Sequence, residues 1–589
     1  MLKELLCLGA LILLGGASAG SVSAQEKTSA VVDMRWAVKI PMRDGVSLNA
    51  TVFEPHERKE ALPVIFTFTP YIGDSYTDRA MYFAGHGYVY ALVDVRGRGN
   101  SGGDFEPFVN EGRDGSDVVE WFAKQPYCNG KVTMWGGSYA GFDQWTVLKE
   151  FPPHLMTIVP AAAAHPGVDF PFQHNLFGPY IEQWLTFTSG ATSNGALFGN
   201  RAFWASKERE MYKQHRAFKD YDELAGNPSK NFQKWVEHPE PDAYYDAMAP
   251  TVENYRKISI PILTITGHFD GDQLGAFEYY KRHMAQGSAE SKASHYLIIG
   301  PWDHAATRTP RAEIAGLKFA PASVVDLNQL HKEWYDWTMK GGAKPEFLKK
   351  RVAYYEMGAE EWKYADSLEA IAKGKLSLFL GSNGAAGDIL HSGELKETRP
   401  AGAPSDQWTY DPLDTRPGEA EPDEDPAGLT SQRGATELYG QGVVYHSQPF
   451  PETREVTGFP KLTLWLSMDV PDTDLEADLY EIQSDGSSIA LSGASMRARY
   501  RNSLRQASPV PAGKVEKYTF TNFTFFSRRV GKGSRLRLVV HSINSIQVEK
   551  NYNSGGVVAA ETAKDARTAH ITLFHDADRP SQLELPIVE

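Results

Sequence analysis

KVTMWGGSYAGFDQ, residues 131–144, is the stretch that decides the fold. Its first residues form a short apolar run typical of a buried strand, two glycines permit a sharp turn with Ser138 at its tip, and a helical pattern begins at Tyr139. Strand, tight turn and helix in this order are the context of a nucleophile elbow, in which a strained turn exposes a serine above a parallel sheet. Ser138 is therefore a candidate nucleophile, although a Gly-Gly-Ser turn alone can equally be only a turn.

The segments around this stretch alternate between strands and helices. Residues 62–69 and 88–95 are near-continuous apolar runs, as in parallel strands buried on both faces, whereas 31–53 alternates like an antiparallel pair. This rhythm stops over 166–258, where aromatic residues and helix formers predict an inserted helical cap, and it resumes at 259. We expect a doubly wound α/β sheet whose cap roofs the ligand site at the carboxyl ends of the strands and sets substrate choice.

Beyond residue 375 the chain consists of period-2 strands separated by Gly, Pro and Asp turns, typical of an antiparallel β-sandwich or jelly roll. The predicted fold class is therefore α/β, an α/β-hydrolase fold with an inserted helical cap, followed by a C-terminal all-β jelly-roll domain. The predicted units are a signal peptide (1–24), the first part of the α/β-hydrolase domain (31–165), the cap (166–258), the second part of the hydrolase domain (259–374) and the jelly roll (375–589).

Composition and charge exclude some classes of function. The chain is 42% hydrophobic, which indicates sizeable cores rather than disorder. Its formal net charge of -14 leaves no basic excess to bind phosphate backbones, so nucleic acid is not an expected partner.

The N-terminus has the order of a secretory signal peptide: Lys3, an apolar run over 5–14, then small residues. We expect cleavage after Ala24, with Ala19 as second choice, and a secreted or periplasmic protein. The apolar run is too short to span a bilayer, so no permanent membrane anchor is expected. Cys7 leaves with the signal and Cys128 remains alone, which excludes an intrachain disulfide in the mature protein.

One acidic and one basic candidate complete a triad with the elbow serine. In α/β-hydrolases the triad follows the order serine, acid, histidine. Asp270 lies in GHFDGD just past one predicted strand, and His304 lies in GPWDHA just past the next. Both therefore belong to the same sheet edge as Ser138, and the predicted triad is Ser138, Asp270 and His304.

The oxyanion of the tetrahedral intermediate needs hydrogen-bond donors. The first predicted donor is the backbone N–H of Tyr139 at the start of the helix, where the helix dipole also helps. The second is expected from the loop after the strand 62–69, where Tyr71 offers a phenolic O–H. Trp302 and Asp272 are assigned to the substrate pocket.

Some alternatives stay open at this level. Asp272 could replace Asp270 as the triad acid, because a two-residue shift on a loop is not settled by sequence. His268, Asp270, Asp272 and His304 could instead form a metal site, but that would leave the elbow unexplained. No cofactor and no metal are expected.

The motifs GGSYAG (136–141), TPY (69–71), VDVRGRGNSGG (93–103), GHFDG (267–271) and GPWDH (300–304) resemble those of the CocE/NonD hydrolases. That family includes cocaine esterase, X-Pro dipeptidyl-peptidases, α-amino-acid ester hydrolases and glutaryl-cephalosporin acylases. The resemblance implies a helical cap, a C-terminal jelly roll and the same five catalytic positions, and it favours Asp270 over Asp272. Where α-amino-acid ester hydrolases carry acidic residues, this chain has Ala140 and Gln273, so their ammonium-binding carboxylate cluster looks incomplete.

The expected function is that of an exported serine hydrolase that cleaves small acyl esters or amides through an acyl-enzyme on Ser138. The alternatives within the enzymes are an X-Pro dipeptidyl-peptidase and an acylase of amino-acid or β-lactam amides. From another class, a non-catalytic carbohydrate- or surface-binding protein is the alternative, against which the complete triad speaks. Substrates are expected to be small esters, amides or short peptides.

Overall fold

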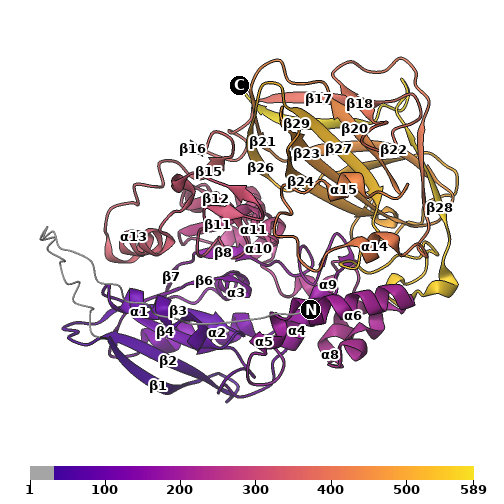
Figure 1. Ribbon diagram of the computed structural model, residues 1–589. Coiled ribbons are helices and arrows are strands. Elements are labelled where there is room, and N and C mark those ends of the chain that lie inside the picture. Colours follow the sequence, from indigo (N-terminus) through magenta and orange to yellow (C-terminus); the bar gives the residue numbers. More distant parts are fainter. Residues whose placement is uncertain (1–31) are drawn as a thin grey trace, which may run out of the picture.

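The computed structural model describes residues 32–589 (Figure 1). The predicted signal peptide, residues 1–24, lies outside this part of the chain. Among the described residues, no helix is both long enough and apolar enough to cross a membrane.

The α/β unit is built on two six-stranded sheets, with strand orders β1-β2-β4-β3-β5-β7 and β6-β8-β11-β12-β15-β16. The chain runs from β5 to β6 and from β7 to β8 with breaks only at Trp135 and at 158–159, so the sheets continue one another as one layer. The strands are β1 Val32–Pro41, β2 Ser47–Pro55, β3 Leu62–Thr69, β4 Val89–Asp94, β5 Cys128–Met134, β6 Gly136–Ser138, β7 Leu155–Thr157, β8 Pro160–Ala163, β11 Ile262–Phe269, β12 His295–Asp303, β15 Val352–Glu356 and β16 Glu361–Ala365.

Helices cover both faces of this layer, which explains the continuous apolar runs. In β3, Ile65 faces the core formed with α1 (Thr77–Ala84) and α13 (Leu327–Lys340), while its neighbour Phe66 faces the core formed with α2, α3 and α11. Successive strand residues point to opposite faces, so a strand covered on both sides must be apolar at every position. The remaining helices of this unit are α2 Glu111–Ala123, α3 Tyr139–Leu148, α11 Gln273–Gln286 and the short α12 Ala289–Ala293.

The segment between β8 and β11 forms a helical cap with an aromatic core. Trp184 and Trp235 of the cap pack together with Phe108 and Tyr139 of the α/β unit. This shared cluster fixes the cap directly beside the start of α3. The cap helices are α4 Tyr180–Phe187, α5 Gly195–Phe198, α6 Arg201–Gln214, α7 Tyr221–Ala225, α8 Lys230–Val236, α9 Ala243–Asp246 and α10 Val252–Lys257.

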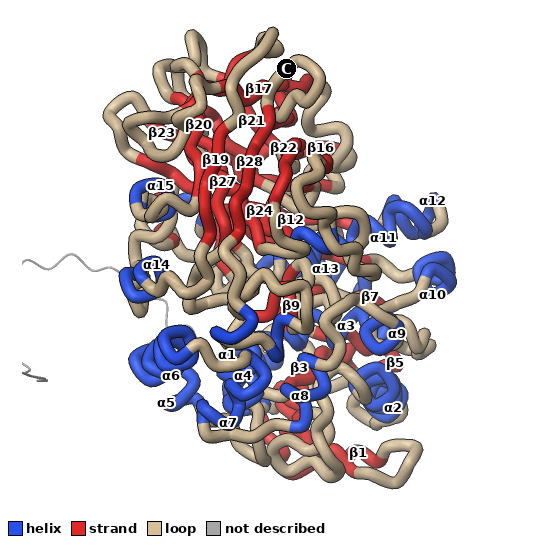
Figure 2. Tube along the Cα trace, turned by 90° about the vertical axis from the view of Figure 1, so that its right-hand side faces the viewer, coloured by secondary structure: helices blue, strands red, loops and turns tan. Residues whose placement is uncertain are grey.

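The C-terminal part is an all-β domain of thirteen connected strands, whose ladders are antiparallel except for the β18–β20 pair. Figure 2 shows these strands gathered above the helices of the cap and the α/β unit. The strands are β17 Gly374–Gly381, β18 Gly393–Lys396, β19 Asp406–Tyr410, β20 Gly442–Ser447, β21 Arg454–Gly458, β22 Lys461–Met468, β23 Asp474–Ile482, β24 Ser488–Arg497, β25 Glu516–Phe520, β26 Phe526–Val530, β27 Arg535–Ser542, β28 Ala569–Phe574 and β29 Gln582–Val588. Their jelly-roll connectivity stays a prediction.

Ion pairs attach this domain to the other two parts. Arg529 on β26 binds Glu356 at the end of β15 through two contacts of 2.9 and 2.8 Å. Arg505 pairs with Asp246 at the end of α9 in the cap. The all-β domain therefore contacts both the sheet that carries the site and the cap beside it.

Candidate active site

Ser138 occupies a strained turn between β6 and α3. Its φ of 62° lies in the left-handed region, which a residue with a side chain adopts only when its surroundings enforce it. A Cβ on Gly136 would lie 2.5 Å from the Cβ of Ala140, and one on Gly141 would lie 2.8 Å from the carbonyl oxygen of Ala161. Both flanking glycines are therefore required for the turn to pack against the helix and the next strand.

The sheet register brings the acid and the base together. β11 and β12 are parallel neighbours, and Phe269 pairs with Asp303, so Asp270 and His304 leave the sheet side by side. The Nδ1 atom of His304 lies 2.9 Å from Oδ1 of Asp270. A carboxylate can only accept this hydrogen bond, which places the proton on Nδ1 and leaves Nε2 free to act as a base.

Asp270 is held in place by further hydrogen bonds. Its side chain has no exposed surface, and it accepts from the hydroxyl of Thr266 at 2.9 Å and from the N–H of Asp272 at 3.0 Å. Asp272 itself approaches Nδ1 of His304 only to 3.8 Å, beyond hydrogen-bonding distance. The geometry therefore favours Asp270 over Asp272 as the partner of His304.

A pocket of about 230 Å³ brings the predicted residues together. Asp270 lies behind His304, outside the pocket wall. The lining residues are Tyr71, Phe108, Ser138, Tyr139, Ala164, Phe170, Tyr180, Trp184, Gly271, Asp272 and His304.

Two groups are placed to donate hydrogen bonds to an oxyanion near Ser138. The phenolic oxygen of Tyr71 accepts from the indole N–H of Trp184 at 3.0 Å, and burial raises the pKa of Tyr71, so its own O–H is retained for donation. The N–H of Tyr139 belongs to the first residue of α3 and has no acceptor within the helix. The Tyr139 phenol donates to Glu111 at 2.5 Å.

The charges around the base alter its pKa. Burial lowers the pKa of His304, but the charge of Asp272 and the hydrogen bond and charge of Asp270 outweigh this, so the pKa is raised above 6.5. Burial also raises the pKa of Asp272 to about 6, against the opposing charge of His304. Asp272 therefore lines the pocket and raises the pKa of His304 through its charge.

Trp302 does not line this pocket, so its assignment as a pocket residue is corrected. It still lies within β12, its side chain is fully buried, and its indole N–H donates to the carbonyl of Ser323 at 2.9 Å. Close packing against Gly267 and Gly300 encloses it in the core.

The four-residue metal alternative is not supported by the geometry. The ring of His268 is buried beside Phe525, and neither ring nitrogen has a hydrogen-bonding partner among the described residues. Within residues 32–589, the side chains of metal-binding type that lie close enough together to share an ion are in the all-β domain, away from this site.

Sequence reasoning missed Asp169, which lies beside the pocket. It follows β8, its oxygens accept the N–H groups of His165 at 2.8 Å and Gly275 at 2.5 Å, and it lines an adjoining cavity of about 340 Å³ together with Asp272. The one available signal was its place in the loop that follows β8, at the same sheet edge as Asp270. It also missed the cap aromatics, since no spacing indicates which of them turn toward Ser138.

An elbow serine and a histidine in one pocket, with a buried aspartate behind the histidine, define a serine hydrolase of the α/β-hydrolase class. The family model of the X-Pro dipeptidyl-peptidase (S15 family) matches residues 44–306, and that of the X-Pro dipeptidyl-peptidase C-terminal non-catalytic domain matches 346–584.

Individual proteins match along nearly the whole chain. Cocaine esterase from Rhodococcus sp. (strain MB1 Bresler) is 25% identical over 589 residues, covering 94% of this chain and 98% of that protein. An α-amino acid ester hydrolase superimposes with a TM-score of 0.81 at 21% identity, covering 96% of this chain and 100% of the other. A CocE/NonD family hydrolase from Staphylococcus aureus superimposes with a TM-score of 0.64 at 18% identity, covering 94% and 93%. The chain belongs to the CocE/NonD family of serine hydrolases.

Proposed function

We propose that this serine hydrolase cleaves small acyl esters and amides through an acyl-enzyme on Ser138. The observation that carries the proposal is the shared pocket of Ser138 and His304, with Asp270 bound to the far side of the imidazole. Ser138 Oγ attacks the substrate carbonyl carbon while Nε2 of His304 takes its proton. His304 then protonates the leaving group, and a water molecule, activated by the same nitrogen, hydrolyses the acyl-enzyme.

The tetrahedral oxyanion would be held by the O–H of Tyr71 and the N–H of Tyr139. Donors fixed in advance stabilise the transition state without reorganising during the reaction. The hydrogen bond from Trp184 supports this role, because it holds the Tyr71 oxygen in one position.

The size and lining of the pocket support a small acyl group. Phe108, Phe170 and Trp184 contribute apolar walls to a volume of about 230 Å³. An aromatic or short aliphatic acyl group would remove this surface from water on binding.

A fluorophosphonate probe tests the nucleophile. The wild-type protein should be labelled, Ser138→Ala should not, and Ser206→Ala, which changes an exposed serine of α6, should be labelled like the wild type. Labelling that survives Ser138→Ala would remove Ser138 from the mechanism, and an inert wild-type protein would favour a non-catalytic binding protein.

A second candidate is the hydrolysis of substrates whose acyl part carries an ammonium group, as in α-amino esters and X-Pro dipeptides. Asp169 and Asp272 favour it, since they line the same cavity next to the pocket. Burial raises the pKa of Asp169 well above its usual range, and the charge of Asp272 adds to this. A bound cation would relieve both effects, adding to the opposing charges that His304 and Arg308 already place near Asp272.

A substrate panel separates the two candidates. It compares an aryl ester, the matching α-amino ester, a glutaryl amide and Ala-Pro-anilide by kcat/KM. A hydrogen bond to a charged group contributes about 1.5–3 kcal/mol, so Asp169→Asn should lower kcat/KM for the amino ester by roughly 10-fold or more. The amine-free ester serves as the internal control; equal losses on both esters would count against an ammonium site.

We also propose that the mature protein is exported and begins at Gln25. The order of residues before Ala24 supports this. N-terminal sequencing of the protein recovered from outside the cytoplasm would test it; an intact Met1 there would contradict cleavage.

A further inference from the structure

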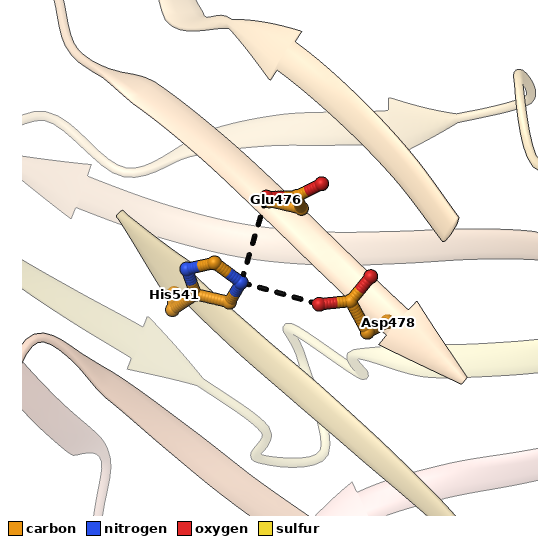
Figure 3. A group of neighbouring side chains, drawn as sticks. All are labelled: Glu476, Asp478 and His541. Carbon is orange, nitrogen blue, oxygen red and sulfur yellow. Dashed lines mark hydrogen bonds and ion pairs between the residues drawn. The ribbon is translucent and has the colours of Figure 1, made fainter. Parts of the chain in front are cut away.

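A histidine and two carboxylates come together on two neighbouring strands of the all-β domain (Figure 3). Glu476 and Asp478 lie two residues apart on β23 and therefore share one face, and Glu476 is the direct cross-strand partner of His541 on β27. The Nε2 atom of His541 lies 3.2 Å from Oδ2 of Asp478 and 3.7 Å from Oε2 of Glu476. Nothing in the proposed reaction uses these residues.

We propose that Glu476, Asp478 and His541 bind a divalent transition-metal ion, with Zn²⁺ and Co²⁺ as the best matches. The candidate ligand atoms all lie within 4.8 Å of one another. Zinc bonds of 2.0–2.2 Å in tetrahedral geometry place ligand atoms about 3.4 Å apart, which lies between the two separations measured from Nε2. One nitrogen and two carboxylate oxygens form a ligand set that suits such ions and leaves a fourth position open.

The orientation of His541 supports a ligand role. Its Nδ1 lies 3.0 Å from the carbonyl oxygen of Ser542. A carbonyl can only accept, so Nδ1 carries the proton and Nε2 faces the carboxylates. Metal-binding histidines are commonly oriented in this way, by a hydrogen bond from the ring nitrogen that does not bind the metal.

Both carboxylates have oxygen atoms available to bind a metal ion. Among the described residues, Glu476 accepts no hydrogen bond and its single ionic partner is His541. The strand partner of Asp478 on the other side is Gly493, whose missing side chain leaves the carboxylate open, since a Cβ there would lie 2.9 Å from Oδ1. Glu421 adds a further negative charge nearby.

The competing occupant is a proton on Nε2. Burial lowers the pKa of His541, but the hydrogen bond to Asp478 and the charge of Glu476 outweigh this and raise it to about 9. A metal ion must displace that proton, so its apparent affinity should rise with pH. Measurements at pH 8 reduce this penalty.

Ions can reach the cluster through two cavities. Glu476 lines the cavity of about 340 Å³ that adjoins the active-site pocket, and Asp478 lines a second cavity of about 360 Å³. Gly271 lies on the wall of both. A solvent path and room for bound water are therefore present.

Titration of the metal-free full-length protein with CoCl₂ and ZnCl₂ tests the site. We expect one equivalent of Co²⁺ to give ligand-field absorption at pH 8, Zn²⁺ to displace it, and calorimetry to record one proton-releasing site. Glu476→Gln and His541→Ala should each weaken binding by about 10-fold or more, whereas His570→Ala, which removes an exposed histidine paired with Asp469, should not.

The near-isosteric Glu476→Gln variant keeps the test valid if His541→Ala unfolds the domain. Its aryl-ester hydrolysis and circular dichroism should match those of the wild type. Absence of stoichiometric binding by the wild type, or equal binding by Glu476→Gln, would overturn the proposal and leave His541 as an imidazolium that bridges two carboxylates.

Discussion

Replacing Tyr71 by phenylalanine should remove one of the two oxyanion donors without changing the pocket wall. The loss of a single donor of this kind costs about 2.7–4 kcal/mol in the transition state, equivalent to 10²–10³-fold in kcat. KM should change little, because the substrate carbonyl in the ground state needs this donor far less than the oxyanion does. The same change also leaves the buried indole N–H of Trp184 without its acceptor, which should lower stability by about 1–3 kcal/mol.

Steady-state kinetics on an aryl ester separate these two effects. The assay is run below the melting temperature of the variant, measured by circular dichroism, so that lost activity is not lost fold. Tyr180→Phe is the matched control, since Tyr180 lines the same pocket and should leave kcat unchanged. A Tyr71→Phe enzyme with the wild-type kcat, or one that loses activity only through KM, would refute the oxyanion assignment.

Three further changes have distinct expected outcomes. Asp270→Asn should lower kcat by about 10⁴-fold by favouring the wrong tautomer of His304, whereas Asp272→Asn should retain most activity. The reverse ranking in steady-state assays would make Asp272 the triad acid instead of Asp270. The raised pKa of His304 places the acid limb of the pH profile of kcat/KM above pH 6.5, because the base must be neutral to act. Asp272→Asn should move this limb to lower pH, because it removes the negative charge that raises the pKa of His304. An unmoved limb would contradict this effect of Asp272. Burial raises the pKa of Glu111 to about 7, so the folded state binds more protons than the unfolded state between pH 4.5 and 7 and loses stability as the pH rises through this window. Glu111→Gln should therefore raise the melting temperature more at pH 8 than at pH 5. Equal shifts at both pH values would argue against this role of Glu111.

The sequence is most informative where backbone constraint and chemistry coincide. Ser138 could be assigned because only glycines fit on either side of its turn, and those glycines are visible in the sequence. Asp270 and His304 could be paired because consecutive parallel strands end at one edge, which the register of Phe269 with Asp303 realises. Each of these placements depends on local chain geometry.

The placements that sequence did not reveal depend on tertiary packing. Trp302 is two residues from His304, yet it faces a core closed by Gly267 and Ser323, which come from other segments. Asp169 carries no strand-end motif comparable to GHFDG, and it is held beside the site by the N–H groups of His165 and of Gly275 on α11. The cross-strand meeting of Glu476 with His541 likewise requires the pairing of two strands far apart in sequence.

The geometry also changes which part of the chain can set substrate choice. Sequence reasoning assigned that role to the cap alone. However, Gly271, between Asp270 and Asp272, lines the catalytic pocket and both cavities beyond it. The walls of those cavities include Tyr480, Ser495, Ile543 and other residues of the all-β domain. A substrate that extends past Asp272 would therefore meet the C-terminal domain as well as the cap, so variants of both are needed to define specificity.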